Sequence, residues 1–124
     1  MAPSQPLTDR ARELIAERFR AMGEPTRLKI LERLFRSPAS VGEILESVGG
    51  RQANVSKHLG VLHAGSLVRR RKEGNRIVYS IADPSLERIC AVVCDAVSRD
   101  ARDEAAAVSG RPRRPRAGEA GRDR

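Results

Sequence analysis

The sequence has few aromatic residues and no long hydrophobic run. Its 124 residues contain two Phe, one Tyr and no Trp, so they do not supply the several aromatic platforms on which single-stranded nucleic acid stacks. The longest apolar run covers six residues, from Ile89 to Cys94, whereas about 20 are needed to cross a bilayer. The first ten residues also lack the apolar core of a signal peptide. We therefore expect a cytoplasmic protein without a membrane partner.

Cysteine and histidine are also scarce. The two thiols are Cys90 and Cys94, and the two histidines are His58 and His63. Because thiols stay reduced in the cytoplasm, a permanent disulfide is not expected. Neither histidine is placed by the sequence to activate Cys90, which belongs to an apolar helical pattern. We therefore expect a protein that is not an enzyme.

The charge is strongly basic and unevenly distributed. Lys and Arg number 24 against 16 Asp and Glu, which gives a formal charge of +8. A charge of this sign favours a polyanionic partner such as nucleic acid. Residues 110–124 carry six arginines and only two acidic residues. Because this segment has no periodicity and little apolar surface, we expect a disordered tail over 109–124, which either adds non-specific affinity for DNA or is a solvated spacer.

Hydrophobic periodicity predicts five helices and one hairpin. Apolar residues recur at helical spacing over residues 8–22, 25–36, 40–48, 52–63 and 84–106. Two runs rich in β-branched or basic residues, 67–72 and 76–81, predict strands joined by a turn at residues 73–75. The predicted fold class is mainly α with a β-hairpin wing. It predicts a winged helix-turn-helix domain over 8–108, preceded by a flexible N-terminus at 1–7.

Several helix starts are marked by the residue types that begin helices. Thr8 is a predicted N-cap, and Pro25 stands at a first helical position. Ser40 and Glu43 have the spacing of a capping box, in which the hydroxyl and the carboxylate bond backbone donors reciprocally. These residues predict where the first three helices begin.

The fourth helix carries the first set of candidate DNA-binding residues. It follows a Gly-Gly turn and has a polar face that contains Gln52, Asn54, Ser56, Lys57 and His58. Such side chains donate to phosphates, and Gln or Asn pairs bidentately with adenine in the major groove. The alternative is a polar face that is only solvated.

The hairpin supplies the second set. Five cations surround its turn, namely Arg69, Arg70, Arg71, Lys72 and Arg76. A tight turn lets a hairpin tip approach the phosphate backbone or the minor groove. The alternative is a charged edge that prevents aggregation, but five cations opposed only by Glu73 exceed that need. We therefore assign DNA binding to Arg71, Lys72, Asn75 and Arg76.

Four motifs resemble those of a known family. They are MGEPTRLKIL at 22–31, NVSKHL at 54–59, HAGSLV at 63–68 and EGNR at 73–76. In order and spacing, over about residues 14–100, the chain resembles ArsR/SmtB-type repressors. The resemblance implies a homodimer paired through the first and last helices, with one recognition helix and one wing per subunit on double-stranded DNA. It also implies that His58 lies in the DNA-facing segment.

Cys90 and Cys94 are spaced one helical turn apart in the last predicted helix. Three interpretations stay open: they are small buried hydrophobes, they sense oxidation, or they bind a soft metal or trivalent arsenic. The metal ligands that the resemblance implies elsewhere are absent, since Ser40-Val41-Gly42 stands in place of Cys-x-Cys and the last helix has no His. We therefore assign no zinc site and expect no required cofactor.

Together these patterns predict a sequence-specific regulator of transcription that binds double-stranded DNA. We expect a repressor that is released by an inducer, with Cys90 and Cys94 as candidate sensing thiols. Two alternatives remain, a winged helix that binds an acidic protein and a regulator that has no small-molecule inducer. Salt-dependent binding to duplex DNA separates the first alternative from the prediction.

Overall fold

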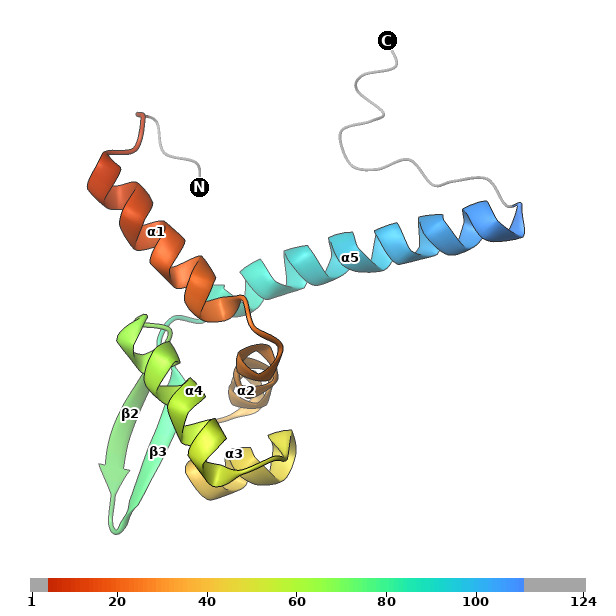
Figure 1. Ribbon diagram of the computed structural model, residues 1–124. Coiled ribbons are helices and arrows are strands. Elements are labelled where there is room, and N and C mark those ends of the chain that lie inside the picture. The colour runs from red at the N-terminus through yellow and green to blue at the C-terminus, as the bar shows by residue number, and fades with distance from the viewer. Residues whose placement is uncertain (1–4, 111–124) are drawn as a thin grey trace. The chain divides into compact units, whose positions relative to one another are not determined.

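The computed structural model describes residues 5–110 (Figure 1). In chain order its elements are α1 (Asp9–Met22), α2 (Pro25–Arg36), β1 (Ala39–Ser40), α3 (Val41–Val48), α4 (Gln52–Ala64), β2 (Val68–Glu73), β3 (Arg76–Ile81) and α5 (Ser85–Ser109). The chain divides into two compact units, one up to residue 86 and one from residue 87 on. The first unit holds the helix-turn-helix and the hairpin, and the second holds α5 from residue 87 on. The flexible segment predicted at 1–7 and the tail predicted at 109–124 lie largely outside the described residues.

The predicted helix starts are confirmed. The Thr8 side chain accepts a hydrogen bond from the Ala11 amide at 3.1 Å, and Pro25 is the first residue of α2. Ser40 and Glu43 form both halves of a capping box at the start of α3. The N-cap of α2 is Glu24, whose side chain accepts a hydrogen bond from the Arg27 amide at 2.8 Å. Ser, Thr, Asp and Asn are the usual residues at this position.

The hydrophobic core joins α2, α3 and α4. Its largest fully buried side chains are Ile30, Leu31, Ile44, Val55, Leu59 and Leu62. Fully burying one such side chain contributes roughly 1.5–3 kcal/mol. Three of the six come from α4, so this helix is fixed against α2 and α3 by one face. Its opposite face is thereby held outward.

The hairpin belongs to a sheet of three antiparallel strands in the order β1-β3-β2. β1 was not predicted from the sequence, since two residues carry no periodicity. It pairs Ala39 with Tyr79 and Ser40 with Val78, and so connects the start of α3 to the hairpin. The two-residue turn begins at Gly74, whose φ of +61° suits glycine and the twist of a tight hairpin.

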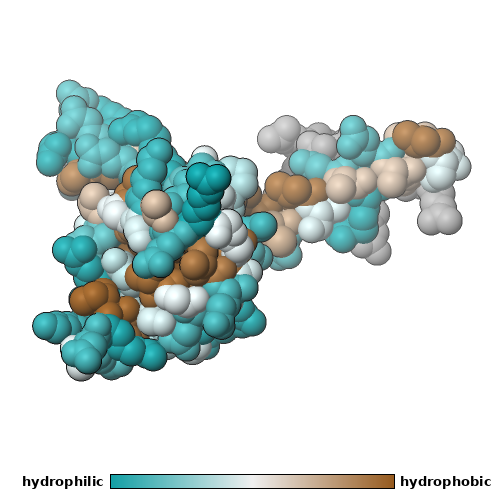
Figure 2. Space-filling model, turned by 60° about the horizontal axis from the view of Figure 1, so that its bottom comes forward, coloured by the Kyte–Doolittle hydropathy of each residue, from teal (hydrophilic) through white to brown (hydrophobic). Residues whose placement is uncertain are grey.

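Helix α5 spans 25 residues and ends three residues beyond the predicted limit of 106. Ile89, Val92, Val93 and Val97 are all exposed on it, and hydrophobic side chains are visible along it in Figure 2. α1 also exposes large apolar side chains, Leu14, Ile15 and Phe19. Among the described residues, no helix is long and apolar enough to cross a membrane.

Candidate nucleic-acid interface

The outward face of α4 carries most of the polar residues predicted from the sequence. Gln52, Asn54, Ser56 and Lys57 are exposed, whereas Val55 and Leu59 between them are fully buried. Since residues three and four apart share a face of a helix, the buried residues fix which side chains face solvent. Four predicted residues are therefore displayed together on a helix that cannot rotate without losing its core contacts.

The start of α4 adds a cation that the sequence prediction missed. Arg51 is the N-cap residue, and its side chain makes no capping hydrogen bond. An open hollow of about 500 Å³ at this end is lined by Arg51, Ala53, Asn54 and Lys57. The N-terminal end of a helix favours anions through its unpaired amides and its dipole. This end of α4 therefore combines two cations with an Asn amide, a set suited to phosphate and base edges.

His58 does not share that outward face. Its side chain is only 12% exposed, and its Nδ1 lies 3.2 Å from Nη1 of Arg27 and 3.7 Å from a carboxylate oxygen of Glu24. Both partners come from the start of α2. The expected DNA-facing position of His58 is therefore corrected: the ring packs between α4 and α2, because position 58 lies on the flank of the buried face.

The hairpin displays its cations on both faces of β2. Of the six residues in this strand only Val68 is buried. Successive side chains alternate between the two faces of a strand, so Arg69 and Arg71 share one face and Arg70 and Lys72 share the other. Asn75 is exposed at the tip, beside Arg76. The wing residues predicted from the sequence thus lie together on an exposed, basic hairpin.

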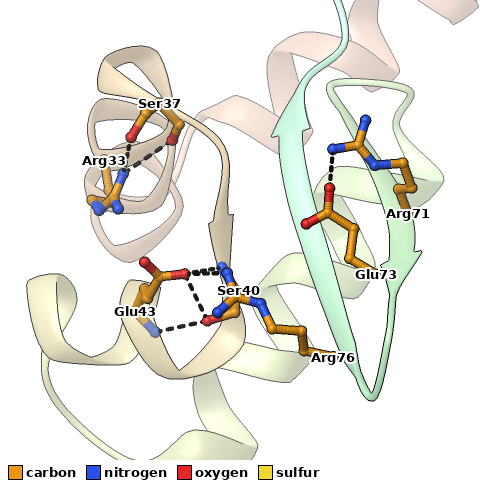
Figure 3. A network of polar contacts seen from close by, with 7 residues as sticks. All are labelled: Arg33, Ser37, Ser40, Glu43, Arg71, Glu73 and Arg76. Carbon is orange, nitrogen blue, oxygen red and sulfur yellow. Dashed lines mark hydrogen bonds and ion pairs between the residues drawn. The ribbon is translucent and has the colours of Figure 1, made fainter.

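Two of the wing cations have carboxylate partners (Figure 3). Arg71 Nη2 lies 2.5 Å from Glu73 Oε1, and Arg76 Nη2 lies 2.9 Å from Glu43 Oε1. From the sequence, Glu73 was the one acid expected to oppose the cations of the wing. Glu43 was missed because it is 33 residues away from Arg76 in the chain. The Arg76 side chain is still 57% exposed, so the pair orients Arg76 without hiding it.

Glu43 is held in its ionised form by several donors. Hydrogen bonds from the amide and the hydroxyl of Ser40, followed by the charge of Arg76, lower the pKa of this carboxyl below its ordinary value. Both Ser40 contacts measure 3.0 Å and reach the same oxygen that contacts Arg76. One carboxylate oxygen therefore caps α3 and fixes a wing arginine.

The two thiols lie on α5, with Cys90 half-buried and Cys94 exposed. Neither is in a disulfide. Within residues 5–110 no three His, Cys, Asp or Glu side chains are grouped closely enough to hold a metal ion. A site at these thiols in one chain therefore offers two sulfur ligands.

Comparisons with known proteins agree with this geometry. Residues 22–71 match a family model described as a helix-turn-helix domain. The transcriptional regulator Rv0081 of Mycobacterium tuberculosis is 39% identical over 97 residues, which cover 77% of this chain and 85% of the relative. The repressor SmtB of the same species is 33% identical over 101 residues, 82% of this chain and 70% of that protein.

Solved structures show the same fold. The crystal structure of Rv0081 superposes with a TM-score of 0.71 at 37% identity, over 79% of this chain and 99% of that one. The homodimeric winged helix-turn-helix DNA-binding domain of Mb0332 from Mycobacterium bovis gives a TM-score of 0.70 at 28% identity, over 81% and 93% of the two chains.

A helix-turn-helix with an outward polar face, followed by a basic hairpin, defines a winged-helix DNA-binding regulator of transcription. The relatives show to which family within this class the protein belongs. The chain belongs to the ArsR/SmtB family of winged helix-turn-helix transcriptional regulators.

Proposed function

We propose that this protein is a repressor that binds an operator as a homodimer, with α4 in the major groove and the wing on the adjacent backbone. The observation that carries the proposal is the outward face of α4, where Gln52, Asn54 and Lys57 are exposed above a fully buried Val55 and Leu59. Amide side chains at the start of such a helix suit base edges, and the cations suit phosphates. The protein acts by occupying DNA in the cytoplasm, without catalysis.

The dimer is supported by the apolar residues that one chain leaves in water. On α1, Phe19 is 57% exposed, and on α5, Val93 and Val97 are 56% and 61% exposed. Large apolar side chains that are exposed on a helix in this way mark interaction surfaces. The relative Mb0332 is a homodimeric winged helix-turn-helix domain. We assign α1 and α5 to the interface between two copies of this chain, because these two helices carry most of the large apolar residues that are exposed in the described part of the chain.

Binding to DNA tests this function directly. Fluorescence anisotropy is measured on a labelled duplex from upstream of the protein's own gene and on a scrambled duplex of the same length and composition, across a range of salt concentrations. We expect tighter binding to the upstream duplex and a linear loss of log affinity with log salt, with a slope of roughly −0.9 per phosphate contacted. No binding to either duplex overturns the proposal and favours the protein-binding alternative.

For the inducer we propose a soft, thiophilic centre that is bound by Cys90 and Cys94, such as trivalent arsenic. Thiolates are the ligands that soft ions prefer. The two residues are one helical turn apart, where the Cβ atoms are about 5–6 Å from each other. A direct disulfide needs about 3.5–4.5 Å between the Cβ atoms, whereas an arsenic atom between the sulfurs spans a longer gap. Each thiol displaces one hydroxyl from arsenic as water, so no oxidant is required.

The inducer proposal is tested with arsenite and, separately, with HgCl2 on the DNA-bound protein. We expect release from the duplex for wild type and no release for the double variant Cys90→Ser/Cys94→Ser, which keeps the size of both side chains. Binding that is indifferent to both reagents makes the cysteines packing residues. Release that persists in the double variant assigns the effect to another part of the protein.

A further inference from the structure

The guanidinium of Arg27 joins three helices in the first unit of the chain. From its place in α2 it donates from Nε to the Ala21 carbonyl at 2.6 Å and from Nη2 to the Arg20 carbonyl at 3.2 Å. These carbonyls belong to the last turn of α1. The remaining arm, Nη1, lies 3.2 Å from Nδ1 of His58 in α4.

The contact with His58 selects one tautomer of the neutral imidazole ring. Arg is always protonated and has donors only. Nδ1 of the neutral ring must therefore accept from Arg27, which leaves the ring proton on Nε2. The His58 side chain is 12% exposed, so the contact is shielded from water. Glu24, 3.7 Å from Nδ1, also caps α2 through the Arg27 amide and is a second charged group close to the ring.

A second contact brings α1 and α4 together at the far end of α4. A Cβ atom built at Gly65, the C-cap residue of α4, would lie 3.0 Å from the Cβ of Ala21. Ala21 is the same residue whose carbonyl accepts from Arg27. The last turn of α1 therefore touches α4 directly at its C-terminal end and through Arg27 near its middle.

We propose that Arg27 is a positioning residue for DNA recognition, which acts through His58 to hold α4 at the angle that presents Gln52 and Asn54 to base edges. The proposal rests on the DNA-binding function proposed above. Arg27 is half-buried and faces α1 and α4, so it contributes through the orientation of the helix and not through phosphate contacts. A planar guanidinium has donors in three directions, and an ammonium on a flexible stem does not reproduce this geometry.

If Arg27 has this role, its loss affects the affinity for the operator and the affinity for scrambled DNA differently. Base contacts depend on the orientation of α4, whereas phosphate contacts from the wing do not. Loss of Arg27 therefore lowers affinity for the operator while affinity for scrambled DNA stays close to normal. A defect that only unfolds part of the protein lowers both affinities by the same factor.

The test compares wild type with Arg27→Lys, Arg27→Ala, His58→Leu and the double variant Arg27→Ala/His58→Leu. Anisotropy is measured on operator and scrambled duplexes, with the melting temperature of each variant recorded. We expect Arg27→Lys and Arg27→Ala to reduce the ratio of operator to scrambled affinity about tenfold or more, comparable to the loss of one base contact. Because Arg27 acts through His58, we expect the double variant to reduce this ratio no further than Arg27→Ala or His58→Leu alone.

Arg33→Ala is the matched control. Arg33 also lies on α2 and also donates to a backbone carbonyl at a helix end, that of Ser37 at 3.0 Å. Its removal takes away the same charge, and we expect it to leave the affinity ratio unchanged. ¹⁵N NMR of the His58 ring supplies a second readout: wild type shows the Nε2-protonated tautomer at a pH where the ring is neutral, and Arg27→Ala loses that preference.

Each outcome has a distinct meaning. A wild type that shows no preference for the operator overturns the proposed function and this inference with it. A wild type that prefers the operator, together with an unchanged ratio in folded Arg27→Lys, overturns this inference alone. Losses that add in the double variant show that Arg27 does not act through His58, which also overturns it.

Discussion

Arg76 of the wing and Glu43 of α3 form an ion pair, with Nη2 and Oε1 separated by 2.9 Å. Glu43 is also the acidic half of the capping box that begins α3. β1, which comes directly before α3, pairs with β3, the strand that begins at Arg76. The wing is thus connected to the helix-turn-helix by backbone pairing and by one carboxylate. A basic hairpin held in this way has a defined direction relative to α4.

Acid is expected to weaken the connection at Glu43. Its pKa is lowered in the folded chain, first by hydrogen bonds from Ser40, so its stabilising effect is fully present above the pKa of the unfolded chain. The effect is lost as pH falls through the lower, folded value. In urea unfolding across pH 7 to 3, we expect Glu43→Gln to be less stable than wild type at pH 7 and the two to converge in acid. The exposed Glu46 of α3 supplies the control Glu46→Gln, for which a similar convergence would contradict the assignment.

Two glycines five positions apart, Gly60 and Gly65, are expected to respond in opposite directions to alanine. Gly65→Ala places a methyl group 3.0 Å from the Cβ of Ala21, and such overpacking costs about 1–3 kcal/mol. Gly60, inside α4, has nothing within 4 Å of the added atom, so Gly60→Ala is expected to stabilise by about 0.5–1 kcal/mol through helix propensity. Thermal unfolding of both variants checks this. Equal effects of one sign would show that α1 and α4 are not in close contact.

The dimer is expected to depend on the apolar stripe of α5. Val93→Asp puts a carboxylate into the proposed interface, where an unpaired charge is costly to desolvate. Sedimentation analysis is expected to show monomers at concentrations at which wild type is dimeric. Ala91→Asp, an exposed position of α5 on the other side of the helix, introduces the same charge and should leave the dimer intact. Dissociation by both variants alike would argue against an interface on this face.

Local residue chemistry predicted much of the fold. Thr8, Pro25 and the Ser40 and Glu43 pair start helices as expected, because caps depend on residues only three positions apart. β1 could not be predicted, since its two residues are ordered by pairing with a strand that begins 36 residues later. The order of the other elements, in contrast, followed directly from periodicity.

The site was predicted less completely than the fold. Exposed positions such as Asn54 were recovered because the buried partners Val55 and Leu59 show a clear helical period. His58 was misplaced by its polar character, although its position three residues after Val55 puts it on the flank of the buried face. The role of Arg27 depends on contacts with His58 and with the end of α1, which no local pattern records.

One binding measurement separates base recognition by α4 from phosphate binding by the wing. Operator and scrambled duplexes are titrated with wild type, Asn54→Ala and Lys72→Ala over a range of salt concentrations. We predict that Asn54→Ala loses about 1–3 kcal/mol on the operator alone, whereas Lys72→Ala weakens both duplexes equally and reduces the salt slope by about 1. If Asn54→Ala weakened both duplexes equally, or if Lys72→Ala changed the preference between them, the assignment of base recognition to α4 and of phosphate binding to the wing would be contradicted.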